Sequence, residues 1–226
     1  MKILNSDFSK KKLYEISVLS DEEKRLLSSV YINKERISNG NLLDYQVISL
    51  KKIRYAHSYL NEKYPDKKFC FVEIEPENKF NGNNYTYISF YELLNNKKIY
   101  NMKIYERDGE YSAEDNYYGE LVKTEYDEAV RKILCQLPVK KCRVCTRFPF
   151  LYGKEIDGKM SVEKMFALGE KLVRKTSIYI DELINSEEES IQLMSKIKSL
   201  MVEHNLYGFY AVYIMNGQFS TNFSCF

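Results

Sequence analysis

Three cysteines close together are the most metal-like feature of this 226-residue sequence. Cys142 and Cys145 stand three residues apart, and Cys135 precedes Cys142 by seven. A structural zinc ion needs four ligands, commonly supplied as two close pairs, and the sequence lacks a second pair. In an extended segment, side chains three residues apart also point to opposite faces. The pattern favours reduced thiols that pack as small apolar groups, and we expect no metal.

The chain contains only two histidines, His57 and His204, which limits acid–base catalysis. A thiol hydrolase or transferase needs a cysteine within hydrogen-bond reach of a base. Cys70 and His57 fit this need best, because a predicted helix leads into the predicted strand that carries the cysteine. The sequence has no nucleophile elbow, Walker loop or glycine-rich fingerprint. We therefore predict no catalytic or cofactor-binding residue and keep a thiol enzyme as the second alternative.

Charge is strongly segregated although the net charge is only +2. Residues 104–128 contain nine acids and two bases, whereas residues 129–154 contain seven bases and no acid. Such blocks can attract partners of opposite charge. A nucleic-acid-associated regulator that uses the basic block 129–154 is thus the first alternative function. Most of the 20 tyrosines fall in predicted strands, which favours packing over base stacking.

Periodicity predicts an α+β fold, an antiparallel sheet (a meander plus a C-terminal hairpin) with packed helices. Capping boxes at Ser20 and Ser186 begin two helices. Predicted helices span 21–38, 42–62, 124–137, 161–180 and 187–204. Predicted strands span 69–75, 85–91, 99–106, 111–118, 209–215 and 218–226.

We expect one domain over 1–226, with a joint near 138–159 between two helix-plus-hairpin halves. The start of the chain turns polar before any signal-like region forms. The longest apolar run, 209–215, is far shorter than the ~20 residues that span a membrane. We therefore expect a cytoplasmic protein with no membrane partner, and the abundant Lys, Asn, Ile and Tyr suggest a bacterial source.

Two segments of the sequence resemble immunity proteins of bacterial polymorphic toxin systems. Residues 98–137 combine an aromatic strand, the acidic turn 106–109, a second strand and a helix that begins with Glu125-Tyr126-Asp127-Glu128-Ala129. The closing helix and hairpin, 195–226, also resemble the end of an immunity-type family. The resemblance implies a non-enzymatic protein that binds and blocks a cognate toxin domain through an acidic and aromatic surface. The residues expected to contact the toxin are Glu110, Glu114, Asp115, Tyr117, Tyr118 and Glu120.

Overall fold

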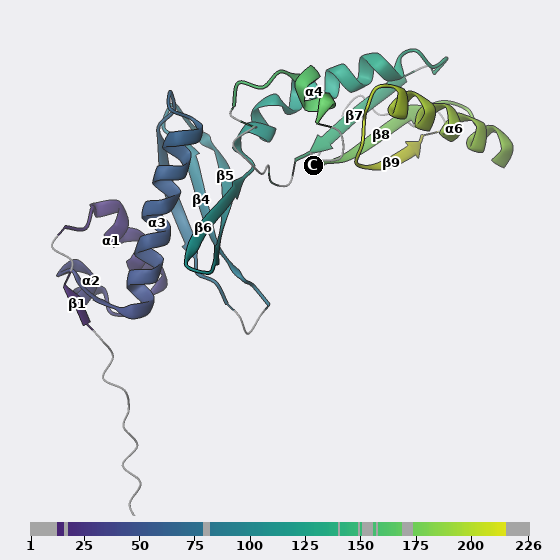
Figure 1. Cartoon of the computed structure of the whole chain (residues 1–226). Coiled ribbons are helices and arrows are strands. Elements are labelled where there is room, and N and C mark those ends of the chain that lie inside the picture. Colours follow the sequence, from purple (N-terminus) through teal and green to yellow (C-terminus); the bar gives the residue numbers. More distant parts are fainter. Residues whose placement is uncertain are drawn as a thin grey trace, which may run out of the picture. The chain divides into compact units, whose positions relative to one another are not determined.

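The computed structural model describes residues 13–15, 18–78, 82–139, 141–148, 150, 156, 158–168 and 174–215. The chain divides into two compact units, Met1–Glu114 and Asp115–Phe226 (Figure 1). Both combine helices with a sheet, so the predicted α+β class is confirmed. The boundary falls just before a helix and not within 138–159, where the joint is predicted. No helix in the described part of the chain is both long and apolar enough to cross a membrane.

The first unit contains a four-stranded meander and three helices. Its helices are α1 (Asp21–Val30), α2 (Lys34–Ser38) and α3 (Asp44–Lys63). Its strands are β1 (Leu13–Glu15), β2 (Asn41–Leu43), β3 (Phe69–Glu75), β4 (Tyr85–Glu92), β5 (Asn95–Arg107) and β6 (Glu110–Asp115). The order β3-β4-β5-β6 confirms the predicted antiparallel meander, while β1 and β2 form a separate two-stranded sheet.

Two side chains of α1 hold β3. One carboxylate oxygen of Glu22 accepts a hydrogen bond from the Phe71 amide, and the other lies 2.8 Å from His57 Nε2. Arg25 donates to the carbonyl oxygens of Phe71 and Val72. The His57 ring stacks on Phe71 with centroids 4.1 Å apart, which brings α3 onto the same strand. These contacts lie where the pairing of β3 with β4 shifts register, between Phe71 and Glu73.

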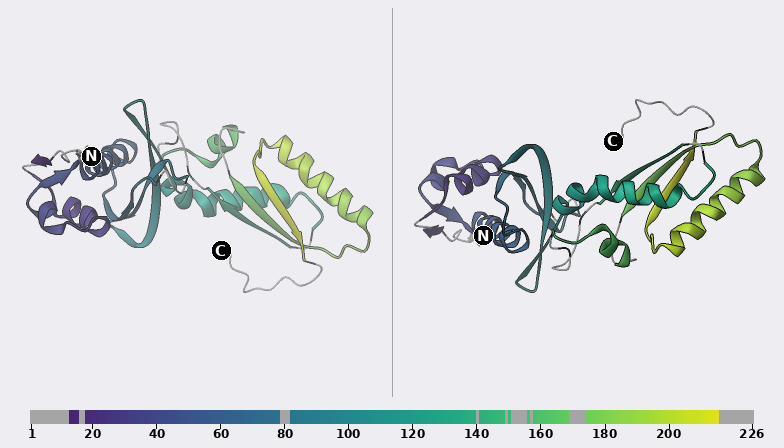
Figure 2. Two further views of the ribbon diagram at one scale, coloured as in Figure 1. Left: turned by 90° about the horizontal axis from the view of Figure 1, so that it is seen from below. Right: turned by 90° about the horizontal axis from the view of Figure 1, so that it is seen from above.

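The second unit has a three-stranded mixed sheet with α4 lying along one face (Figure 2). Strands β7 and β8 are antiparallel, and β8 and β9 are parallel, joined through α6. Tyr126, Val130 and Leu134 of α4 are fully buried. The elements are α4 (Tyr117–Leu134), β7 (Lys141–Arg147), α5 (Val162–Ala167), β8 (Lys175–Asp181), α6 (Glu187–Glu203) and β9 (Phe209–Ile214).

Four expected elements differ from the structure. The helix predicted over 21–38 is two helices, because α1 ends at Val30 and α2 begins at Lys34. The helix predicted over 161–180 is wrong in its second half, because α5 ends at Ala167 and β8 occupies 175–181. The strand predicted over 111–118 is too long, because α4 begins at Tyr117 and not at Thr124. In the predicted C-terminal hairpin, β9 is present but pairs with β8, and the partner segment 218–226 lies outside the described residues.

Asp127 attaches α4 to β7. Its carboxylate accepts a hydrogen bond of 2.8 Å from the amide of Thr146, whose side chain is fully buried. Burial raises the pKa of Asp127 to about 6, although the hydrogen bonds from Thr146 and the charge of Lys123 oppose the increase. A carboxyl group that is hard to ionise therefore lies in the α4–β7 contact.

Replacing Glu22 with glutamine should weaken the attachment of β3. Burial alone would raise the pKa of Glu22, but the hydrogen bonds from His57 and Phe71 outweigh it and hold the pKa below its usual value. At pH 7 we expect Glu22→Gln to destabilise the first unit by about 1–2 kcal/mol. The lowered pKa means that the folded protein favours the ionised form of Glu22. The difference in stability between the wild type and Glu22→Gln should therefore shrink as the pH falls below 4.5. Hydrogen exchange of β3 amides measures both effects, and Glu35→Gln on α2 is the exposed control.

Asp127 should produce the opposite pH response in the second unit. Between about pH 4 and pH 6 the unfolded chain releases this proton before the folded chain does, so stability falls as the pH rises through that window. Asp127→Asn keeps an oxygen acceptor for the Thr146 amide and removes the charge. We expect slower exchange of β7 amides at pH 7 in this variant. Its stability should not fall between pH 4 and 6 as that of the wild type does. Equal behaviour of Asp127→Asn and the exposed control Glu125→Gln would contradict this assignment.

Candidate functional site

Most of the residues expected to contact a toxin are buried. Glu114, Asp115, Tyr117 and Tyr118 have exposed fractions of 3%, 0%, 1% and 4%, whereas Glu110 is exposed and Glu120 is partly exposed. The prediction that these four residues form part of an exposed surface is therefore wrong. Toxin binding as such stays a prediction.

Local hydrogen bonds explain this burial. Glu114 accepts a hydrogen bond of 2.6 Å from the Tyr105 hydroxyl, and Asp115 accepts one of 2.9 Å from the Tyr117 amide at the start of α4. Tyr118 donates to the carbonyl oxygen of Met160. Because α4 begins earlier than predicted, both tyrosines lie in its first turn and face the interior.

The basic block contributes to a different surface, formed by one face of β7–β8–β9. The side chains of Thr176, Ile178 and Ile180 are buried, so the alternate residues of β8 lie on the opposite face. Strand register builds three rows across that face. They are Arg147–Lys175–Phe209, Cys145–Ser177–Ala211 and Arg143–Tyr179–Tyr213. Arg147 and Lys175 thus lie beside Phe209 at one end of the face, and the two tyrosines lie beside Arg143 at the other.

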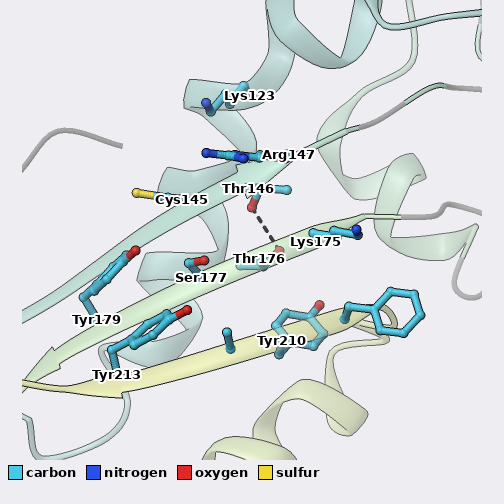
Figure 3. Close-up of a pocket in the computed structure, with 12 residues that line it drawn as sticks. Lys123, Cys145, Thr146, Arg147, Lys175, Thr176, Ser177, Tyr179, Tyr210 and Tyr213 are labelled. Carbon is cyan, nitrogen blue, oxygen red and sulfur yellow. Dashed lines mark hydrogen bonds between the residues drawn. The ribbon is translucent and has the colours of Figure 1, made fainter. Parts of the chain in front are cut away.

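A pocket of about 450 Å³ lies over these rows (Figure 3). Its described lining includes three cations, four aromatic rings and no acid. The cations are Lys123, Arg147 and Lys175, and the rings are Tyr179, Phe209, Tyr210 and Tyr213. We call Arg147, Lys175, Tyr179, Phe209 and Tyr213 the cation–aromatic face.

Two rings of the cation–aromatic face are well exposed. Phe209 is 69% exposed and Tyr213 is 46% exposed. Tyr213 stacks on Tyr179 of the neighbouring strand, with ring centroids 4.9 Å apart and planes at 13°. The pair stands side by side at one end of the pocket (Figure 3). The stacked pair forms an aromatic wall at this end of the pocket.

The cysteines do not form a metal site in the described part of the chain. No group of three or more His, Cys, Asp or Glu side chains there is placed to hold a metal ion. Cys135 and Cys142 are free thiols, and burial raises the pKa of Cys142 to about 11. Cys145 is disulfide-bonded, so the expectation that the cysteines are reduced is wrong for this residue.

The structure brings Cys70 and His57 to a common carboxylate. His57 Nε2 lies 2.8 Å from Glu22, and the Cys70 thiol interacts with the same carboxylate and with the Phe71 carbonyl oxygen, 3.8 Å away. In a cysteine–histidine–carboxylate triad the imidazole lies between the thiol and the carboxylate. Here the carboxylate is the shared partner, so the cluster holds β3 and does not have the order of a nucleophile and its base.

The sequence did not predict that Lys175 and Phe209 are neighbours. They come from the segment predicted as helix and from the start of β9, and only the parallel pairing of β8 with β9 makes them adjacent. Alternation of buried and exposed residues over 175–181 is the signal that could have revealed β8.

Comparisons with known proteins identify no family. No family model matches the sequence, and no curated protein matches it. Among solved structures, the chain is similar to a crystal structure of a DUF5037 family protein from the bacterium Ruminococcus gnavus ATCC 29149. The two share 14% identity with a TM-score of 0.34, over 71% of this chain and 73% of that chain. No immunity-protein family appears in these findings, so that resemblance stays a prediction.

Proposed function

We propose that this chain is a binding protein and that its cation–aromatic face binds single-stranded nucleic acid. The observation that supports this proposal is the described lining of the pocket, which combines three cations with four aromatic rings and contains no carboxylate. An anion is attracted to such a pocket, and a carboxylate that would repel it is missing from the described lining.

The arrangement suits the two parts of a nucleotide. Lysine and arginine side chains contact phosphates, and bases stack on exposed aromatic rings. Phe209 lies in the same row as Arg147 and Lys175, so a base on this ring would have cations beside it for its phosphate. Open sheet faces with aromatic residues are a recurrent platform for single strands.

The same lining favours binding over catalysis. It includes Ser177 and Thr146 as hydroxyl groups, but no histidine and no carboxylate among the described lining residues to act as a general base. Cys145, the thiol position of the pocket, is disulfide-bonded. The described lining therefore has the groups that binding needs, but not a general base for catalysis.

Reversing two charges of the cation–aromatic face should weaken binding of a single strand. Arg147 and Lys175 are both exposed, so Arg147→Glu with Lys175→Glu should leave the fold intact. Each lost phosphate contact lowers the slope of log affinity against log salt by about 0.7. We expect a slope smaller by about 1.4 in the double variant and at least tenfold weaker binding of a fluorescent 12-nucleotide strand, measured by anisotropy.

The matched control is Lys198→Glu on the exposed side of α6, which should bind like the wild type. Phe209→Ala should weaken binding at least fivefold with an unchanged salt slope, because stacking contributes about 1–3 kcal/mol per base. Binding that is absent, insensitive to salt or equal in all variants would refute the proposal. Salt-sensitive binding of an acidic protein in place of the strand would also refute it.

An immunity role is the second candidate, favoured by a patch of the first unit. The turn between β5 and β6 exposes Glu106, Asp108 and Glu110, and the rings of Tyr55 and Tyr111 meet below it with centroids 5.4 Å apart. Lys52, which is 1% exposed, lies 3.6 Å from Glu106 and 3.2 Å from Glu77. Acids and aromatic rings of this kind suit a basic toxin cleft.

Charge reversal at this turn should slow toxin binding if the immunity role holds. Glu110→Lys should lower the association rate with a toxin domain encoded by a neighbouring gene about tenfold, because exposed charges act mainly on association. Glu35→Lys on α2 is the matched control, since Glu35 is also exposed. Surface plasmon resonance gives the rate. The lack of any such neighbouring gene, or equal rates for both variants, would count against the role.

A further inference from the structure

The second unit buries an arginine that no described acid neutralises. Arg174 has an exposed fraction of 0% and precedes β8 directly. Its Nη2 donates to the carbonyl oxygen of Asn205 at 3.3 Å, and its guanidinium lies 5.4 Å from the centre of the Tyr126 ring. Its Nε and Nη1 atoms have no hydrogen-bond partner. Since Nε carries one N–H and Nη1 carries two, three of its five N–H donors make no hydrogen bond of standard geometry to a described residue, although the Tyr210 hydroxyl interacts with the guanidinium.

The described side chains nearby do not supply a negative charge. Burial raises the pKa of Tyr126 and of Tyr210, so both hydroxyl groups stay neutral at physiological pH. Asp127 follows Tyr126 on α4, but a carboxylate paired with arginine has a lowered pKa, whereas that of Asp127 is raised to about 6. No described acid forms an ion pair with Arg174.

Such a buried charge is costly, because an isolated ion loses its hydration and gains nothing in return. Arginine cannot avoid the cost by releasing its proton. Water could accept the three hydrogen bonds but would leave the charge uncompensated. The physical requirement is an acceptor that is also negative.

The surroundings offer further donors to such an acceptor. The buried Tyr126 hydroxyl makes no hydrogen bond of standard geometry, and the Tyr210 hydroxyl is close enough to both Tyr126 and Arg174 to interact with each. The turn after α6 lies against the arginine, since a Cβ at Gly208 would be 3.0 Å from Arg174 Cγ. Glycine, with φ of 143° here, allows this close approach.

We infer that Arg174, Tyr126 and Tyr210 form a buried binding site for a small oxyanion, a phosphate or carboxylate group. Guanidinium and phenol donors match the several acceptor oxygens of such a group, and its charge balances that of the arginine. The site lies on the helix-covered side of β7–β8–β9. It shares Tyr210 with the lining of the pocket over the cation–aromatic face, whereas Arg174 and Tyr126 are not among the described lining residues of that pocket.

The test compares melting of the full chain at pH 7 in sodium chloride, acetate and phosphate of equal ionic strength. The wild type should melt roughly 5 °C higher when the oxyanion is at ten times its dissociation constant, with a saturating response. Phosphate and acetate distinguish a phosphoryl from a carboxylate ligand. Arg174→Met keeps the volume without the charge, so it should lose the response and melt no lower than the wild type in chloride.

Lys198→Met removes an exposed cation of α6 and should keep the full response. Tyr126→Phe removes one donor and should weaken binding of inorganic phosphate or acetate, measured by isothermal titration, about tenfold. If Arg174→Met does not fold, the titration of Tyr126→Phe still tests whether the oxyanion site exists. Equal responses of wild type and Arg174→Met, or no oxyanion response of the wild type, would overturn the site, whatever the result for strand binding.

Discussion

The second unit depends on the two-residue alternation of β8, the central strand of its sheet. Thr176, Ile178 and Ile180 face the helices and are buried, which leaves Lys175, Ser177 and Tyr179 on the other face. A shift of one residue would exchange these sets and place a lysine in the core. Hydrophobic burial on one side therefore fixes which side chains lie on the cation–aromatic face.

The parallel pairing of β8 with β9 determines which residues of the two strands lie side by side. Because β9 runs parallel to β8, Phe209 lies beside Lys175 and Tyr213 beside Tyr179. The chain can return in the same direction only through a long crossover, which α6 provides. The same crossover ends in the turn that lies against Arg174, so α6 and its turn connect both proposed sites of this unit.

Local elements follow from the sequence where the signal is local. The capping box of Ser20 and Glu23 forms with both reciprocal hydrogen bonds, of 2.8 and 3.1 Å, and the Asp108-Gly109 turn has the positive φ angles that such dipeptides favour. The meander is predictable because each strand pairs with the next.

Non-local features could not be predicted in the same way. Apolar residues over 161–180 fit helical spacing, and only pairing with β7 and β9 makes 175–181 a strand. The acidic stretch predicts charge but not burial, because Glu114 and Asp115 become interior through tertiary contacts. Arg174 gives no sequence signal, since an arginine next to a lysine normally indicates a solvated surface.

The attachment of α1 to β3 also bears on how the protein avoids self-association. Strand β3 is the last strand of its sheet, and its outer backbone groups could pair with a strand of another molecule. Glu22 occupies the Phe71 amide, and Arg25 occupies the carbonyls of Phe71 and Val72. Local opening of α1 would free these groups before the sheet itself unfolds, so this helix protects an aggregation-prone edge as well as stabilising the unit.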